Sequence, residues 1–257
     1  MTANLQPRRV QLAGLDAIEV VVPGSSPGAL TAVILHGYGA DMTDLAPLAS
    51  VLHAPPGSRW IFPNGILRIP MGPYWTGSAW FPIDIAALEA AMSRGAHRDM
   101  AEIAPPELPG AREAVLGLIA SLGVPLERLL LGGFSQGAML ATDLTLHLPT
   151  SPAGLLLWSG TLLQRELWQA LAPKHAGLAF VQSHGRSDAL LDYGAAERLH
   201  ALLTAAGWRG RFVGFGGGHE IPDGAIEASR ALLAEIDQRL AGAAPGAGST
   251  HATREDA

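Results

Sequence analysis

Short apolar segments alternate along the chain with longer segments in which apolar and polar residues are mixed. The short segments are rich in leucine and β-branched residues, apolar on both faces, and bounded by Gly, Pro or Asn. This pattern is typical of buried strands in a mostly parallel sheet. It predicts strands over residues 18–22, 30–35, 60–62, 129–132, 154–158, 179–184 and 211–215.

Helices are predicted in the longer segments. In the last of them, Ile226, Leu232, Leu233, Ile236 and Leu240 form an apolar stripe, which indicates a closing helix packed on the sheet. Strands that alternate with helices predict an α/β fold with a mostly parallel central sheet and helices on both of its faces. The predicted helices cover residues 43–52, 106–122, 136–148, 193–206 and 223–240.

The alternation breaks between residues 65 and 109, which we interpret as a lid or insertion. The aromatic stretch GPYWTGSAWFPID is followed there by an alanine-rich helical segment that ends at about residue 104. Two interpretations stay open: irregular surface structure, or the wall of a substrate pocket formed by Trp75, Trp80 and Phe81. Residues 1–241 are predicted to form one domain, followed by a disordered tail over 242–257.

Composition narrows the class of protein. With 257 residues, of which 48% are hydrophobic and 16% charged, the chain is globular and long enough for one large core. The net charge of −6 and the scattered arginines argue against nucleic acid binding, and Lys174 is the only lysine. The absence of cysteine from the sequence excludes disulfides, thiolate zinc sites and a cysteine nucleophile.

The N-terminal residues MTANLQPRRVQLAG have no apolar segment after their two arginines, so we do not expect a secretory signal. No apolar run in the sequence approaches the roughly 20 residues that a membrane-spanning helix needs. We therefore expect a cytoplasmic protein without an integral membrane segment. Whether it is a monomer or a homodimer stays open at this point.

Two serines fit the pattern Gly-x-Ser-x-Gly, Ser26 and Ser135. A nucleophile elbow needs a strand, a sharp turn that carries the serine, and a helix that starts directly after it. The stretch LLLGGFSQGAML supplies a predicted strand before Ser135 and strong helix formers after it. Pro23 and Pro27 bracket Ser26, and an extended segment follows, so Ser26 is predicted to lie in a loop between two antiparallel strands. Ser135 is therefore the predicted nucleophile.

A serine nucleophile needs a general base, and the base needs a carboxylate that holds it in the right tautomer. His219 follows a predicted strand and three glycines, on a loop at the edge where such sheets place function. Asp188 is the first acid after the strand that ends at His184, whereas Asp192 is placed to cap the next helix. We predict Asp188 as the acid and His219 as the base. The other histidines after the nucleophile are better explained by packing or surface positions.

An acyl-transfer site also needs N–H donors for the oxyanion. Gln136, directly after the serine, is predicted to supply one backbone N–H, and Tyr38, in the loop after an early strand, the second. His36 is predicted to shape that loop rather than to act as a base. The chain has nine histidines, but no His-x-x-x-His spacing places two of them on one helix face beside a carboxylate. We therefore expect no metal and no other cofactor.

Four motifs, in order along the chain, carry a resemblance: LHGYGADMTDLAPLA, GFSQGAML, SHGRSDALL and GGGHEIP. Together they resemble the phospholipase/carboxylesterase family of α/β-hydrolases, which includes acyl-protein thioesterases and bacterial carboxylesterases. The resemblance implies the α/β-hydrolase fold and the nucleophile, acid, base and oxyanion donors named above. The family's Trp-Phe/Tyr-Asp segment near the acyl pocket resembles residues 80–84, where Pro82 and Ile83 stand before the aspartate.

These residues predict a serine hydrolase that cleaves short- to medium-chain carboxylic esters, and thioesters as an alternative, through an acyl-enzyme intermediate. The expected partner is a small-molecule or lipid acyl ester. Acyl-protein thioesterase, lysophospholipase, dienelactone-type and peroxidase-like activities are alternatives, as is a non-catalytic binding protein with the same fold. The last alternative predicts a broken triad position, and the sequence shows none.

Overall fold

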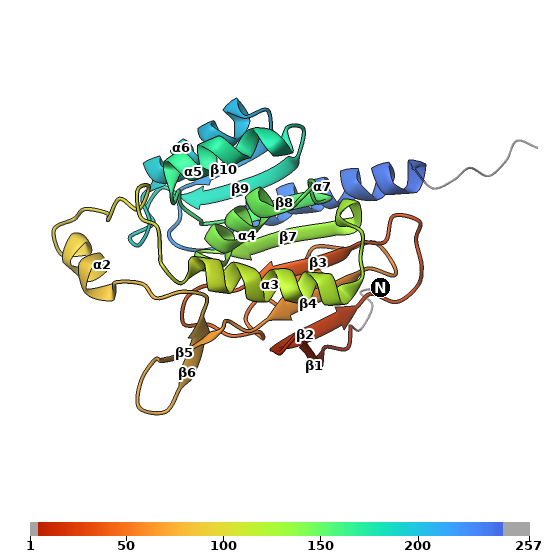
Figure 1. The fold of residues 1–257 in the computed structure, drawn as a ribbon, viewed down its shortest axis with the longest axis horizontal. Coiled ribbons are helices and arrows are strands. Elements are labelled where there is room, and N and C mark those ends of the chain that lie inside the picture. Colours follow the sequence, from red (N-terminus) through yellow and green to blue (C-terminus); the bar gives the residue numbers. More distant parts are fainter. Residues whose placement is uncertain (1–4, 244–257) are drawn as a thin grey trace, which may run out of the picture.

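One eight-stranded sheet organises the residues that the structure describes, 5–243 of a computed structural model (Figure 1). Its strand order is β1-β2-β4-β3-β7-β8-β9-β10. From β4 to β10 neighbouring strands are parallel, while β2 runs antiparallel to both β1 and β4. The strands are β1 (Arg8–Leu12), β2 (Leu15–Val21), β3 (Thr31–Leu35), β4 (Arg59–Pro63), β7 (Leu129–Phe134), β8 (Gly154–Trp158), β9 (Ala179–Gly185) and β10 (Arg209–Phe215).

Each of the predicted strands is confirmed, and β8 has the predicted bounds. All residues of β8 and β9 are buried, which explains the unbroken apolar run that predicts β8. The first strand, β1, is not predicted by the sequence pattern. Its residues, RRVQL, are mostly polar and exposed, because β1 lies at the edge of the sheet and pairs only with β2.

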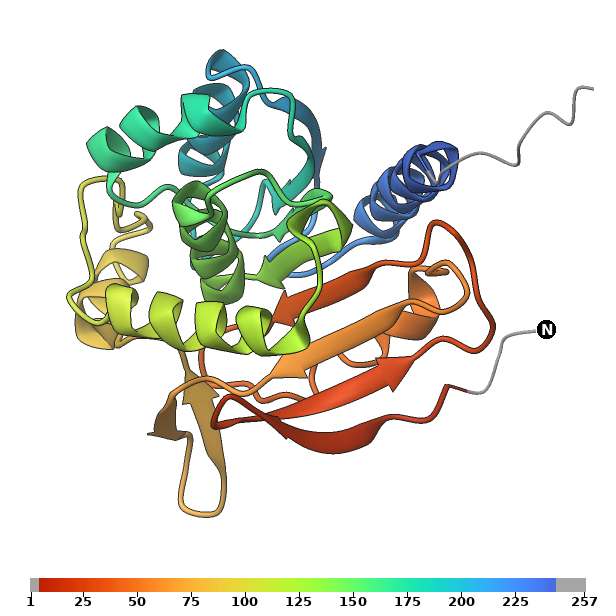
Figure 2. The ribbon, with the colours of Figure 1, turned by 45° about the vertical axis from the view of Figure 1, so that its right-hand side comes forward.

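Helices cover both faces of the sheet, and each face has its own hydrophobic core. One core lies under α3, α4, α5 and α6, and the other under α1 and α7, which Figure 2 shows on the far side of the sheet. The predicted layers are therefore confirmed, although the pattern does not predict the short helix α5. The helices are α1 (Leu48–Val51), α3 (Leu108–Leu122), α4 (Gln136–His147), α5 (Arg165–Leu171), α6 (Tyr193–Ala205) and α7 (Asp223–Gly242), with single 3-10 turns η1 (Leu126–Arg128) and η2 (Ala172–His175).

The predicted helix over residues 43–52 is wrong in its first part, because α1 is a single turn that begins at Leu48. Upstream of it, the Thr43 N–H donates to Asp41 Oδ1 at 2.7 Å and closes a local turn instead. Pro47 stands at the N-cap of α1. Proline lacks an N–H and its ring clashes with the preceding helical turn, so the helix starts only after it.

The insertion after β4 forms a hairpin and a short helix. Strand β5 (Leu67–Pro70) pairs antiparallel with β6 (Thr76–Ala79), and the hairpin projects from the body of the molecule (Figure 1). Helix α2 (Ile85–Met92) follows and is capped by Asp84. The helical segment predicted to reach about residue 104 is thus shorter, because the chain turns after α2 at Gly95, which has φ of 65°.

Three further features are the end of α7, the loop that carries Ser26 and the length of the helices. Helix α7 ends at Gly242, beside the predicted domain end at residue 241, and the predicted tail from residue 244 onward lies outside the described residues. Ser26 lies in the loop between β2 and β3, which run in opposite directions, as predicted. None of the helices between residues 5 and 243 is long and apolar enough to span a membrane.

Candidate active site

Ser135 alone forms the turn between β7 and α4. The strand ends at Phe134, the helix begins at Gln136, and the Ser135 N–H donates to the Trp158 carbonyl at 2.8 Å. The φ of 55° and ψ of −118° of Ser135 lie in a region that non-glycine residues rarely adopt. The strand, sharp turn and helix expected of an elbow are therefore present around this half-buried serine.

Glycines on either side of Ser135 allow the strand and the helix to approach each other. A Cβ on Gly137 would collide with the carbonyl oxygen of Leu35 in β3, and a Cβ on Gly133 would collide with the backbone of Gly137. Any side chain at either position would force the turn away from the sheet. The spacing of the two glycines around the serine thus has a steric cause in this fold.

Asp188 and His219 meet at the carboxyl ends of two neighbouring parallel strands. Asp188 follows β9 and His219 follows β10, so the parallel pairing brings both loops to one edge of the sheet. His219 Nδ1 lies 2.6 Å from Asp188 Oδ2, the short distance of a charge-assisted hydrogen bond. Asp188 is only 3% exposed, whereas 16% of the His219 side chain is exposed. The acid is therefore enclosed, and the imidazole reaches solvent.

The carboxylate of Asp188 is held in its ionised form. Burial acts to raise its pKa, but the hydrogen bond and charge of His219 and the backbone N–H groups of Leu191 and Leu190 outweigh it, so its pKa lies below the usual value. Asp188 Oδ1 accepts from Leu190 N–H at 2.8 Å and from Leu191 N–H at 3.1 Å. By contrast, Asp192 accepts from the first N–H groups of α6, which confirms its predicted capping role.

Two further contacts connect the base and the acid loop to neighbouring segments. The ring of His219 packs against the ring of Phe134, with centroids 4.7 Å apart, so the base lies beside the residue that precedes Ser135. His97, in the loop after α2, has its Nε2 atom 2.7 Å from the carbonyl oxygen of Asp188. The loop sequence around His97 gives no periodic or motif signal for this contact, and sequence reasoning missed it.

The loop after β3 lies beside the turn. A Cβ on Gly37 would come within 3.4 Å of Ser135 Cβ, which places Tyr38 next to the Ser135 turn. Among the described residues, no backbone carbonyl accepts the Tyr38 N–H. Gln136 is the first residue of α4, and the first N–H groups of a helix have no intrahelical acceptor. Both predicted oxyanion donors thus flank the Ser135 turn.

The side chain of His36 forms hydrogen bonds that hold this loop in place. Its Nε2 atom accepts the Gly65 N–H at 3.0 Å, so its Nδ1 atom carries the proton and donates to the Gly37 carbonyl at 2.7 Å. Burial lowers the pKa of His36, although the Gly37 carbonyl and the carboxylates of Asp44 and Asp41 act in the opposite direction. Both ring nitrogens are occupied, which agrees with the predicted structural role.

The side chain of Gln136 holds the aromatic segment against the turn, a role that sequence reasoning missed. Its Oε1 atom accepts the Trp80 N–H at 2.9 Å, and its Nε2 atom donates to the Phe81 carbonyl at 2.6 Å. Gln136 is fully buried. Because it contacts only main-chain atoms of the segment, no side-chain pattern in the sequence signals the pair.

The three aromatic residues predicted to line a pocket occupy different environments. Trp80 and Phe81 are fully buried, and Trp80 Nε1 donates to the His36 carbonyl at 2.9 Å. Phe81 borders a cavity of about 370 Å³ whose other walls come from residues 82–84 and from the segment after α2, including Met100. Trp75 lies at the hairpin tip and is 51% exposed. The three side chains are therefore not brought together around one cavity.

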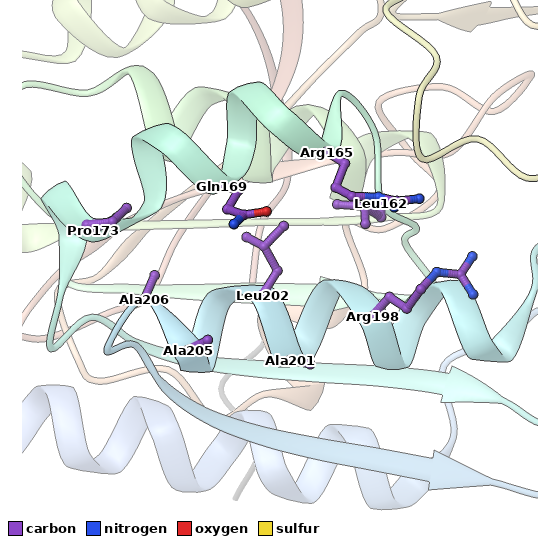
Figure 3. A pocket seen from close by; sticks show the side chains of 9 residues that line it. All are labelled: Leu162, Arg165, Gln169, Pro173, Arg198, Ala201, Leu202, Ala205 and Ala206. Carbon is purple, nitrogen blue, oxygen red and sulfur yellow. The ribbon is translucent and has the colours of Figure 1, made fainter.

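A separate groove of about 500 Å³ lies between α5 and α6 (Figure 3). Its floor is apolar, and Arg165 and Arg198 lie at one end. Both guanidinium groups face acids of the segment after α2, with Arg165 2.9 Å from Glu102 and Arg198 3.5 Å from Asp99. None of the residues that line this groove belongs to the predicted site.

Comparison with known proteins gives the family. Residues 16–235 match the model of the family described as Phospholipase/Carboxylesterase. The chain belongs to this family. Among its relatives, acyl-protein thioesterase 1 of Eremothecium gossypii is 26% identical over 185 residues, which cover 70% of this chain and 75% of the relative. The resemblance read from the four motifs is therefore confirmed.

Solved structures agree with the fold of this phospholipase/carboxylesterase family member. Esterase PE8 superposes with a TM-score of 0.67 at 25% identity, covering 90% of this chain and 99% of that protein. A carboxylesterase from Mesorhizobium loti superposes with a TM-score of 0.68 at 21% identity and the same coverage. The protein has the predicted α/β-hydrolase fold, and its family makes it a carboxylic ester hydrolase.

Proposed function

We propose that Ser135, Asp188 and His219 form the catalytic triad of this ester hydrolase. The observation that carries the proposal is the 2.6 Å hydrogen bond between a buried Asp188 and a solvent-reaching His219, at the sheet edge where the Ser135 elbow lies. A buried carboxylate on Nδ1 leaves Nε2 of His219 to accept a proton. The contact between the rings of His219 and Phe134 supports the placement of that nitrogen near Ser135.

In the proposed reaction His219 Nε2 takes the proton of Ser135 while Oγ attacks the carbonyl carbon of the ester. The tetrahedral intermediate then loses the alcohol, which receives the proton from His219, and an acyl-serine remains. Water attacks the acyl group with His219 again as base, and the carboxylic acid leaves as Ser135 regains its proton. Asp188 keeps its charge throughout and stabilises the imidazolium.

We assign the backbone N–H groups of Tyr38 and Gln136 to the oxyanion. Both flank the Ser135 turn, and the N-terminus of α4 adds a positive dipole end on the same side. Because these donors are main-chain atoms, substitution of the side chains does not remove them. Loss of the loop geometry would remove them, for example through loss of the hydrogen bonds of His36.

For the substrate, we propose short- to medium-chain carboxylic esters. Thioesters are the second candidate, supported by the name of the relatives, acyl-protein thioesterase 1. Phe81 and the cavity beside it are the proposed contact for the acyl chain, whereas Trp80 and Trp75 do not line that cavity. A cytoplasmic location stays a prediction.

The test compares wild type with Ser135→Ala on p-nitrophenyl esters of increasing chain length and on acyl thioesters. We expect Ser135→Ala to lower kcat by about 10⁴-fold or more, and a fluorophosphonate to label wild type at Ser135 only. Ser26→Ala is the matched control, because it changes the other Gly-x-Ser-x-Gly serine and should keep full activity. Full activity in Ser135→Ala would overturn the proposal.

A further inference from the structure

A second histidine contacts the acid of the proposed triad. His184 is the penultimate residue of β9 and is completely buried. Its Nε2 atom lies 3.3 Å from Asp188 Oδ2, the same oxygen that accepts from His219 Nδ1. The proposed reaction uses no atom of His184, so it does not explain why a polar side chain is buried at this position.

The surroundings of the ring fix its tautomer. His184 Nε2 is 3.0 Å from the Leu191 carbonyl as well as near Asp188 Oδ2, and both are acceptors. Its Nδ1 atom is buried and has no hydrogen-bond partner within residues 5–243. A proton on Nδ1 would leave a lone pair of Nε2 against two acceptor oxygens and an unsatisfied donor in the core. The proton therefore sits on Nε2, which donates to the Leu191 carbonyl and lies close to Asp188 Oδ2.

The ring is neutral in this position. Burial lowers the pKa of His184, and this outweighs the Leu191 carbonyl and the charge of Asp188, which act to raise it. Asp192 and His219 are the other ionisable groups with a charge effect on the ring, and the Tyr193 ring of α6 packs edge-on against it. A neutral Nε2–H donor thus faces the carboxylate.

We propose that His184 is a positioning residue for Asp188, an inference that rests on the proposed triad. The backbone N–H groups of Leu190 and Leu191 hold Oδ1, and the His184 Nε2–H holds the Leu191 carbonyl of the same loop, with Nε2 3.3 Å from Oδ2. Because the loop that supplies these N–H donors is tied to the His184 ring, the direction of the carboxylate is fixed before His219 binds to it. Asp188 then presents Oδ2 to His219 in one direction, and the imidazole is oriented with it.

The short distance to Oδ2 has a second consequence. His219 is hydrogen-bonded to Asp188 Oδ2, and the polar Nε2–H of His184, 3.3 Å away, offsets part of the negative charge of the same oxygen. Removing the His184 donor leaves the whole charge to His219 and stabilises the protonated imidazole. Since the base must be unprotonated to act, the acid limb of the pH dependence of kcat/KM moves to higher pH.

The experiment compares His184→Met, which removes the donor, with His184→Gln, whose amide nitrogen reaches the position of Nε2. Competent sites are counted with the fluorophosphonate, and kcat is expressed per labelled site. We expect His184→Met to lose about tenfold to a hundredfold in kcat with little change in KM, and its acid limb to rise by about half a pH unit. His184→Gln should recover most of both.

His200→Met is the matched control. His200 is a partly buried histidine whose Nδ1 is also buried and lacks a partner among the described residues, but its ring packs between Phe180 and Phe212. We expect wild-type kcat per labelled site and an unmoved acid limb in this variant. If His184→Met does not fold, His184→Asn replaces it, because the shorter amide cannot reach Asp188.

A proton signal supplies an independent measurement. The Nδ1 proton of His219, in its short bond to Asp188, should give a low-field NMR resonance that shifts in the variants without the donor and not in His200→Met. Wild-type kcat, acid limb and resonance in His184→Met would show that His184 only fills space. Full activity in Ser135→Ala would instead overturn the triad itself, so the two failures are distinguishable.

Discussion

The turn at Ser135 and the β5–β6 hairpin both pack against the loop of residues 37–40, but they are built in opposite ways. At the turn, main chains approach so closely that no Cβ fits on Gly137. The base of the hairpin is also tight, because the Gly39 N–H donates to the Ser78 carbonyl at 2.8 Å. Its tip, however, leaves Tyr74 99% exposed. The part proposed to bear the chemistry is fixed by main-chain contacts, and the part that faces outward is free to vary.

The largest effect should come from Gly137→Ala, which tests the packed side of the comparison. The added Cβ collides with the Leu35 carbonyl, so we expect a loss of about 3 kcal/mol or more in the free energy of unfolding, measured by urea denaturation. Gly117→Ala is the control, since Gly117 is exposed within α3 and its nearest neighbour atom is 4.0 Å away. That change should stabilise by about 0.5–1 kcal/mol. Equal effects of the two substitutions would contradict the steric account.

An intermediate effect is expected from the histidine beneath the shared loop. Burial lowers the pKa of His36, so the unfolded chain binds a proton near pH 6.5 that the folded chain does not. Stability is therefore full above about pH 6.5 and falls as the pH is lowered toward the folded-state pKa, by at most about 1.4 kcal/mol per pH unit for this group. The free energy of unfolding of His36→Gln, measured between pH 7 and pH 5, should fall less steeply than that of wild type. Parallel curves would mean that His36 is not neutral in the fold.

The smallest effect is expected at the hairpin tip. Trp75→Ala should change the free energy of unfolding by less than about 0.5 kcal/mol, because half of the side chain is already in solvent. If Trp75 belongs to the wall of the substrate pocket, KM for long acyl esters rises while kcat is kept. The exposed Tyr74, changed to Ser, is the control with no expected effect on either quantity. A stability loss in Trp75→Ala comparable to that in Gly137→Ala would erase the contrast between the two regions.

The sequence predicts the sheet better than the insertion, for physical reasons. Central strands are buried on both faces, so their apolar runs are unbroken and easy to read, as in β8. The sequence also predicts that Asp188 and His219 each follow a strand, and the structure shows that these two strands, β9 and β10, are parallel neighbours. The edge strand β1 and the helix α5 carry no such signal. The apolar pattern extends upstream of Pro47, but α1 begins only after this proline, so the pattern alone predicts too long a helix.

The remaining contacts of the candidate site could not be read from the sequence. His97 meets the carbonyl of Asp188 across ninety-one positions of chain, and Gln136 meets main-chain atoms of Trp80 and Phe81. Such contacts depend on where loops lie after the sheet has formed, and no local pattern encodes them. His184 shows the same limit, since its position in the strand is predicted but the direction of its ring is not.

The Gln136 side chain anchors the aromatic segment through main-chain atoms, whereas the cavity is lined by a side chain of that segment, Phe81. Because the amide of Gln136 grips the Trp80 N–H and the Phe81 carbonyl, the hold does not depend on which side chains stand at those two positions. Natural drift or a mutant library at residue 81 can therefore reshape the cavity while the elbow stays where it is. If that cavity receives the acyl chain as proposed, substrate preference can change by single substitutions at residue 81 while Ser135, the proposed nucleophile, keeps its position.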